Sequence, residues 1–111
     1  MKKRYGATRQ VRNFIEAQPY EIQAEYVKLV ERLEADGCLI EPFGKKLDKA
    51  LFEMRLRRGR QVRVIYSYHE GDWVIGLHGF VKKTSRAPLR ELVLARRMKR
   101  RIELGVHEEE G

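Results

Sequence analysis

The sequence predicts one α+β domain, in which an N-terminal helical hairpin packs on a small antiparallel sheet and a C-terminal helix follows. Two observations carry this prediction. Apolar residues recur at helical spacing before Pro42, and they alternate with polar residues after it. The 111 residues suffice for one hydrophobic core and are too few for two, so residues 1–111 are interpreted as a single domain.

Residues 8–36 are predicted to form the helical hairpin. A short apolar stripe over residues 11–15 stops at Pro19, which interrupts helical hydrogen bonding. A second stripe then follows one face of a helix, and it consists of Ile22, Tyr26, Leu29, Val30 and Leu33. Gly37 comes next and is predicted to end this helix in the left-handed conformation.

Three strands joined by tight turns are predicted between residues 51 and 81. The first is LFEMRLR (51–57), the second is QVRVIYSY (61–68) and the third is WVIGLHGFV (73–81). Gly59 lies in the first turn and the run HEGD supplies the second. The final helix is expected to open at Pro88, with Thr84 or Ser85 nearby as its cap.

The turns suggest a register for the sheet. A three-residue first turn places Arg55 opposite Arg63 and Glu53 opposite Ile65, and a four-residue HEGD turn places Arg63 opposite His78. Directly opposed side chains lie about 4.5–5.5 Å apart at Cβ, where like charges repel. A row of Arg55, Arg63 and His78 therefore favours a bound anion. Gly76 removes a side chain where another group approaches closely.

One face of this sheet is predicted to form the core beneath the helices, and the other is predicted to be functional. The functional face carries cationic, polar and aromatic side chains, with Phe80 expected to be exposed. Its predicted members are Glu53, Arg55, Arg57, Gln61, Arg63, Ile65, Val74, Gly76, His78 and Phe80.

The net charge of +8 is unevenly distributed. Residues 1–44 are neutral, residues 45–101 hold 17 basic and 5 acidic side chains, and residues 102–111 hold four glutamates and no lysine or arginine. A cationic half beside a neutral half is typical of a protein that binds a polyanion. The alternatives are a solvated basic surface, a Glu53 that simply neutralises both arginines, and a purely structural His78. The acidic tail at 102–111 has the composition of a disordered segment.

Other classes of function find little support. The three histidines lie in three separate segments without zinc-ligand spacing, so neither a metal nor another cofactor is expected. The single cysteine, Cys38, has no internal disulfide partner and is interpreted as ordinary packing. No apolar run of membrane-spanning length and no signal peptide is present, so we expect a cytoplasmic protein that does not engage membranes.

The predicted cluster suits metal-independent cleavage of RNA. That reaction deprotonates a 2′-hydroxyl, stabilises charge on the phosphate and protonates the leaving oxygen. Arginines bind phosphate bidentately, a histidine exchanges protons near neutral pH, and an exposed aromatic ring stacks on a base. The candidate catalytic residues are Arg63, Arg55, His78, Lys82, Lys83 and Glu53, and the candidate RNA-binding residues are Phe80, Thr84, Arg86, Arg57 and Arg60.

The stretch from Leu51 to Leu92 resembles the RelE/HigB superfamily of toxins from type II toxin–antitoxin systems, in particular its phage-derived Gp49-like branch. The resemblance is carried by Glu53-Met54-Arg55 on one strand, by Arg63 to Tyr66 on the next, and by LHGFVKKT at 77–84. It implies a RelE-like fold and an endoribonuclease (an mRNA interferase) that cleaves messenger RNA on the ribosome.

The resemblance also implies particular residues and partners. Arg63 matches a phosphate-binding arginine of the superfamily, and Arg55 and the Lys82–Lys83 pair match positions that are usually basic. The proton-transfer group stays open between His78 and Glu53. A cognate antitoxin, often of helix-turn-helix type, is implied as partner beside the ribosome and mRNA. A strand normally precedes the helices, and only residues 1–5 are left for it, so either it is very short or the sheet lacks one edge.

Two other functions remain compatible with the sequence. One is a ParE-like gyrase inhibitor that uses the same fold without cutting nucleic acid, and the other is an inactive RNA-binding regulatory module. Cuts within translated codons would favour the nuclease, whereas DNA damage would favour the gyrase inhibitor.

Overall fold

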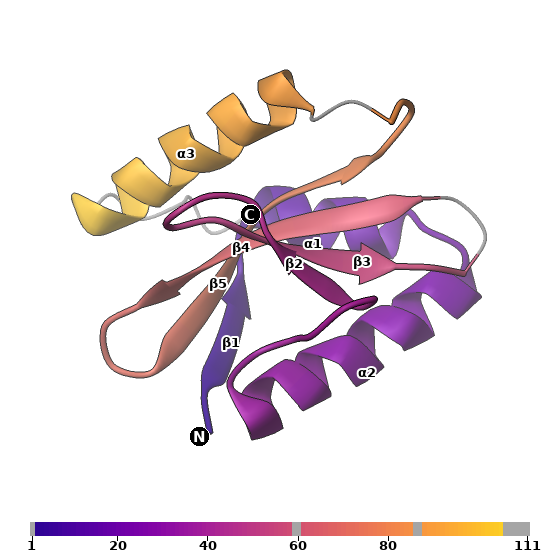
Figure 1. The fold of residues 1–111 in the computed structure, drawn as a ribbon, viewed down its shortest axis with the longest axis horizontal. Coiled ribbons are helices and arrows are strands. Elements are labelled where there is room, and N and C mark those ends of the chain that lie inside the picture. Colours follow the sequence, from indigo (N-terminus) through magenta and orange to yellow (C-terminus); the bar gives the residue numbers. More distant parts are fainter. Residues whose placement is uncertain (1, 59–60, 86–87, 106–111) are drawn as a thin grey trace.

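A five-stranded sheet forms the middle layer of the protein, with helices on both of its faces (Figure 1). The structure is a computed structural model that describes residues 2–58, 61–85 and 88–105. The elements, in chain order, are β1 (Arg4–Ala7), α1 (Arg9–Glu16), α2 (Tyr20–Asp36), β2 (Gly44–Lys46), β3 (Phe52–Leu56), β4 (Val62–His69), β5 (Trp73–Val81) and α3 (Leu89–Glu103). The strand order is β1-β5-β4-β3-β2, and the α+β class predicted from the sequence is confirmed.

The N-terminal helical hairpin is present as predicted. Thr8 begins α1, and its hydroxyl accepts a hydrogen bond from the backbone N–H of Val11. Pro19 separates the two helices, and Gly37 ends α2 with a left-handed φ of 81°. The apolar sides of both helices cover one face of the sheet, where the buried residues are Val11, Ile15, Ile22, Leu29, Leu33, Met54, Leu56, Val62, Val64, Tyr66 and Val74.

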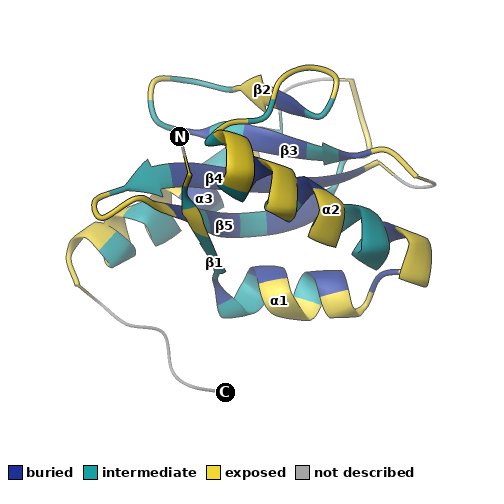
Figure 2. Ribbon diagram, turned by 90° about the horizontal axis from the view of Figure 1, so that it is seen from below, coloured by how far each residue is buried: buried dark blue, intermediate teal, exposed yellow. Residues whose placement is uncertain are grey.

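The opposite face is covered by α3, although the sequence analysis left that face open. Ala95 is fully buried against Ile65, Leu77 and Phe80, and Leu92, Met98 and Ile102 pack around this cluster. Figures 1 and 2 show α2 and α3 on opposite sides of the sheet, with the three central strands largely buried between them. Pro88 is the residue before the helix, and no side chain caps this end, so the cap predicted at Thr84 or Ser85 is wrong.

The sheet has two strands beyond the predicted meander, one at each edge. β1 pairs in parallel with β5, so a strand does precede the helices, and it extends past residue 5 to Ala7. β2 pairs antiparallel with β3 and has only three residues, two of them exposed lysines. So short and basic a segment lacks the apolar alternation that marks a strand in the sequence.

Within the described residues, no helix is long and apolar enough to cross a membrane.

Candidate nucleic-acid interface

The central row of the candidate site is formed by Arg55, Arg63 and Phe80, on adjacent strands. Arg55 pairs with Arg63 as predicted, and Glu53 pairs with Ile65. Arg63 lies opposite Phe80, whereas the sequence analysis placed His78 there; His78 pairs with Ile65 instead. The predicted row of two arginines and a histidine is therefore wrong in its third member.

Two one-residue offsets account for this difference. The β4–β5 turn has three residues, since His69 pairs with Trp73, and not the four assumed from HEGD. β5 also carries a bulge, because Ile65 pairs with His78 while Tyr66 pairs with Gly76, leaving Leu77 as an extra residue.

Between the turn and the bulge only the first offset applies. The side chains in this part of β5 therefore lie on the opposite face of the sheet from the one predicted. Val74 and Gly76 face α1 and α2, and Ile75 and Leu77 face α3. Beyond the bulge the two offsets add to two residues. The side chains of His78 and Phe80 therefore lie on the predicted face, and each is opposite a β4 residue two positions later than predicted.

A buried carboxylate joins the two arginines. Glu53 is 2% exposed, and its Oε1 accepts a hydrogen bond from Nε of Arg55 at 3.0 Å. Its Oε2 lies 3.7 Å from Nε of Arg63. The more distant and exposed Glu41 lies 4.0 Å from Nη1 of Arg55. One fully enclosed negative charge thus offsets the repulsion between the two guanidinium groups, as the alternative interpretation of Glu53 anticipated.

Arg63 is more enclosed than expected for a residue that binds RNA. It is 9% exposed, whereas the sequence analysis placed it on an open face. Nη2 donates to Oε1 of Gln61 at 3.2 Å and Nη1 donates to the backbone oxygen of Val62 at 3.4 Å. Burial lowers the pKa of Arg63, Glu53 raises it, and Arg55 and Arg57 lower it further. Arginine nevertheless stays charged at neutral pH.

The basic residues that follow β5 lie beside this row. The backbone N–H of Lys82 donates to the carbonyl of Gln61 at 2.8 Å, which holds Lys82 next to the start of β4. Lys82 is half-buried, and Lys83, Thr84 and Arg57 are exposed. Arg60 and Arg86 lie outside the described residues.

Two predicted site residues are enclosed beneath α3. Phe80 is only 7% exposed, because it packs in the cluster around Ala95; the expectation of an exposed stacking ring is wrong. The ring of His78 stacks on Phe80 at a centroid distance of 6.0 Å. Nε2 of His78 forms a 2.6 Å hydrogen bond with Oε1 of Glu91 on α3, so this histidine joins the helix to the sheet.

The structure also identifies neighbours that the sequence analysis did not single out as site residues. Glu25 on α2 accepts hydrogen bonds from the backbone N–H groups of Arg57 at 2.9 Å and Arg58 at 3.1 Å. Gln61 contacts both Arg63 and Lys82. The spacing of Glu25 from its apolar neighbours marks it only as a polar helix residue, so no sequence signal assigns it to this loop.

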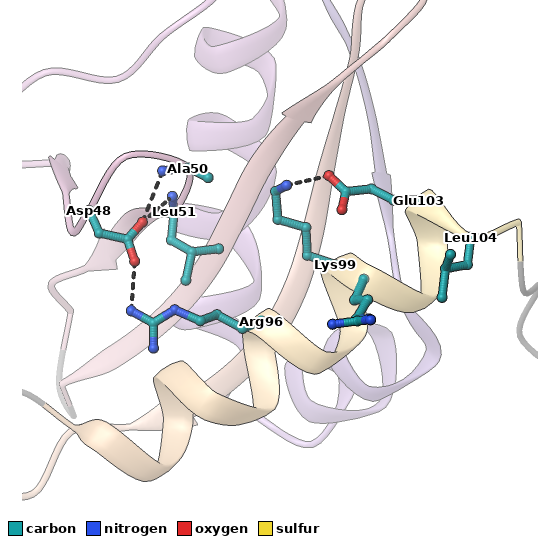
Figure 3. Close-up of a pocket in the computed structure, with 8 residues that line it drawn as sticks. Asp48, Ala50, Leu51, Arg96, Lys99, Glu103 and Leu104 are labelled. Carbon is teal, nitrogen blue, oxygen red and sulfur yellow. Dashed lines mark hydrogen bonds and ion pairs between the residues drawn. The ribbon is translucent and has the colours of Figure 1, made fainter.

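A separate hollow of about 470 Å³ lies between α3 and the segment joining β2 to β3 (Figure 3). Asp48 accepts from the backbone N–H groups of Ala50 and Leu51, each at 2.9 Å, and from Arg96 at 2.7 Å. Lys99 pairs with Glu103 on the same helix. None of the candidate site residues lines this hollow, and its cations are largely paired, so we place the candidate site at the arginine row.

Within the described part of the chain, no three His, Cys, Asp or Glu side chains lie close enough together to hold a metal ion.

Comparison with known proteins defines the class. The chain resembles the archaeal RelE in the crystal structure of a RelE–RelB complex from Pyrococcus horikoshii OT3, with 27% sequence identity and a TM-score of 0.62. The match covers 78% of this chain and 100% of that one. Among curated proteins, none matches the chain with significance. The fold is thus that of the RelE-like toxins of toxin–antitoxin systems.

A comparison of the sequence with family models identifies the family. Residues 13–100 match the family described as Phage derived protein Gp49-like (DUF891), which is most of the chain. The protein therefore belongs to the phage-derived Gp49-like family of RelE-like toxins.

Proposed function

We propose that this protein is the toxin of a type II toxin–antitoxin system and acts as a ribosome-dependent endoribonuclease on messenger RNA. The observation that carries the proposal is the pairing of Arg55 with Arg63 on one face of adjacent strands, with Lys82 held beside them. Membership of a RelE-like toxin family supports the same conclusion.

The arginine row supplies what phosphodiester cleavage by a 2′-hydroxyl requires most. Attack of the 2′-oxygen on phosphorus adds negative charge to the phosphate oxygens, and fixed cations stabilise that charge. Arg55 keeps 22% of its side chain exposed and Arg63 lies directly opposite it, so one phosphate reaches both. Lys82, Lys83, Thr84 and Arg57 surround the row and would hold neighbouring phosphates.

Proton transfer is the second requirement. His78 is the proposed carrier, because imidazole is the side chain that ordinarily gains or loses a proton near neutral pH. In the free protein its Nε2 is bonded to Glu91 beneath α3. Proton transfer by Nε2 of His78 therefore requires that substrate or ribosome binding release this hydrogen bond.

A cognate antitoxin is the proposed protein partner. The structural neighbour is a RelE in complex with RelB. By the family resemblance, the antitoxin of this protein would be encoded beside it and would be of helix-turn-helix type.

The test is a pair of arginine variants expressed briefly in cells, followed by mapping of messenger-RNA 5′ ends. Arg63→Ala should abolish growth arrest and in-frame cleavage, since loss of one charge-stabilising donor typically costs about 100-fold or more in rate. Arg63→Lys should retain part of the activity, because it keeps the charge and loses the bidentate geometry. Arg97→Ala, an exposed position on α3, is the matched control and should behave as wild type.

Circular dichroism and thermal melting establish that each variant is folded. Full toxicity of a folded Arg63→Ala protein would contradict the proposed site. Growth arrest accompanied by DNA damage, without new messenger-RNA ends, would identify a gyrase inhibitor, and the absence of both would identify an inactive RNA-binding module.

A further inference from the structure

The burial of Glu53 and its contacts with two arginines do not suit a group that transfers protons. Its side chain is 3% exposed, and each carboxylate oxygen lies against a different arginine. A general base must reach the hydroxyl from which it takes a proton. The side chain of Glu53 is more deeply buried than either arginine side chain, so a phosphate bound to the exposed parts of the arginines would be separated from it.

The two contacts of Glu53 are unequal. Oε1 makes a hydrogen bond with Nε of Arg55 at 3.0 Å, whereas Oε2 lies 3.7 Å from Nε of Arg63, beyond hydrogen-bond distance. The buried Nε of Arg63 has no hydrogen-bond acceptor among the described residues. Arg55 is thus fixed by a hydrogen bond, while Arg63 is held by charge, with its enclosed Nε against Glu53.

Arg63 is oriented from its other end by Gln61 and the carbonyl of Val62, which each accept one N–H of a terminal nitrogen and leave the second N–H of that nitrogen. In Arg55, too, Nε is the nitrogen that faces Glu53, and the contact of its terminal nitrogen Nη1 with Glu41 is long, at 4.0 Å. A phosphate placed between them would therefore find terminal N–H groups of both arginines.

We propose that Glu53 is a positioning residue that sets the two arginines as a preformed clamp for the scissile phosphate, and that it transfers no proton. This inference rests on the proposed function, because it assigns a role within the same site. The buried carboxylate compensates the repulsion between the cations, and because it lies against the Nε atoms, terminal N–H donors of both arginines stay available to one ligand.

Glu53→Gln tests the proposal, with Glu41→Gln as the matched control. Both substitutions remove one carboxylate near Arg55, but only Glu53 is buried and also near Arg63. Removing the buried charge leaves more net positive charge in the row, so inorganic phosphate should bind Glu53→Gln at least as tightly as wild type. Cleavage should nevertheless fall by about 100-fold, because misplacement of catalytic groups by an ångström costs that much.

The expected signature is thus a loss in kcat with KM unchanged or lowered, and a pH profile with the wild-type shape. In spectra that correlate the proton and nitrogen of arginine Nε–H groups, Glu53→Gln should shift the Arg55 signal, and Glu41→Gln should leave it in place. Phosphate should shift the Arg63 signal in the wild-type protein. Glu53→Asp keeps the charge on a shorter side chain and should give intermediate cleavage, so it serves if Glu53→Gln does not fold.

Three results would overturn the proposal: wild-type cleavage by Glu53→Gln, loss of the acid limb of its pH profile, or an unchanged Arg55 signal. Failure of the wild-type protein to cleave messenger RNA would reject the proposed function alone. The Nε–H spectra and the phosphate titration would still decide whether Glu53 sets the clamp.

Discussion

Gly76 is the residue at which the packing of β5 allows least room for change. A Cβ atom at this position would lie 2.2 Å from the hydroxyl oxygen of Tyr5. That hydroxyl accepts a hydrogen bond from Tyr26 on α2 at 2.8 Å, so it cannot move aside without cost. The sequence indicated a close approach at Gly76, and the approaching group is this partly buried tyrosine and not a ligand.

We therefore expect Gly76→Ala to lower the free energy of unfolding by about 1–3 kcal/mol, the usual cost of overpacking. Gly6→Ala on the neighbouring strand is the control, because its Cβ would meet Trp73 at an ordinary 3.5 Å. Urea denaturation of both variants provides the comparison. Equal stability of the two variants would mean that the side chain of Tyr5 moves aside without a measurable cost in stability.

His69 couples stability to pH. Its Nε2 forms a 2.6 Å hydrogen bond with the hydroxyl of the fully buried Ser67. Burial lowers the pKa of His69 below 6.5, Lys99 on α3 lowers it further, and Glu103 opposes them. The unfolded chain therefore takes up a proton at a higher pH than the native protein does.

The contribution of His69 to stability should be complete above pH 6.5 and should decline as the pH falls through the lowered value of the native state. Thermal melting between about pH 8 and pH 5 measures this slope. His69→Gln keeps a polar partner for Ser67 and removes the titration, so its slope should be smaller. An equal slope in wild type and variant would assign the effect to other groups.

Among the elements, α2 holds the start of the connection from β3 to β4. Both carboxylate oxygens of Glu25 on α2 accept from the backbone N–H of Arg57, and one of them also accepts from Arg58. These are charge-assisted hydrogen bonds that fix the end of β3 close to the arginine row.

Glu25→Gln should cost about 1–2 kcal/mol of stability, because one acceptor oxygen and the charge are lost together. Glu21→Gln, one turn earlier and exposed, is the control. Hydrogen exchange at the amides of Arg57 and Arg58 should accelerate only in the Glu25 variant. Unchanged exchange would show that the strands alone hold this end.

The elements also show where inference from the sequence succeeds. The helical hairpin and the β3–β4 register follow from local signals in the sequence: a proline between the helices, Gly37 after α2, and a glycine between the two predicted strands. The β4–β5 register does not, because Gly71 and Asp72 both adopt positive φ in a three-residue turn and Leu77 bulges. Neither the length of this turn nor the bulge has a distinctive residue pattern here. Together they shift the register by two residues, so that His78 pairs with Ile65 and not with Arg63.

At the scale of the whole molecule, α3 covers a sheet face that the sequence pattern indicated to be open. The sequence assigned α3 no sheet face, although Leu92, Ala95, Met98 and Ile102 form an apolar stripe that must be buried. Covering β4 and β5 with this stripe encloses Phe80 and His78 and leaves Arg55 as the more exposed arginine of the row. The candidate interface is consequently a strip along β3 and the strand ends, and not a broad platform.

The parallel seam between β1 and β5 has a consequence for how the protein is made. Thr8 and Gln10, directly after β1, donate hydrogen bonds to residues 69 positions later, so β1 gains its partner only when β5, the last of the five strands, is present. Contacts so distant in sequence close late and slow folding. A nascent polypeptide that stops short of β5 lacks the strand with which both β1 and β4 pair, so the sheet cannot be completed before residue 81 has been made.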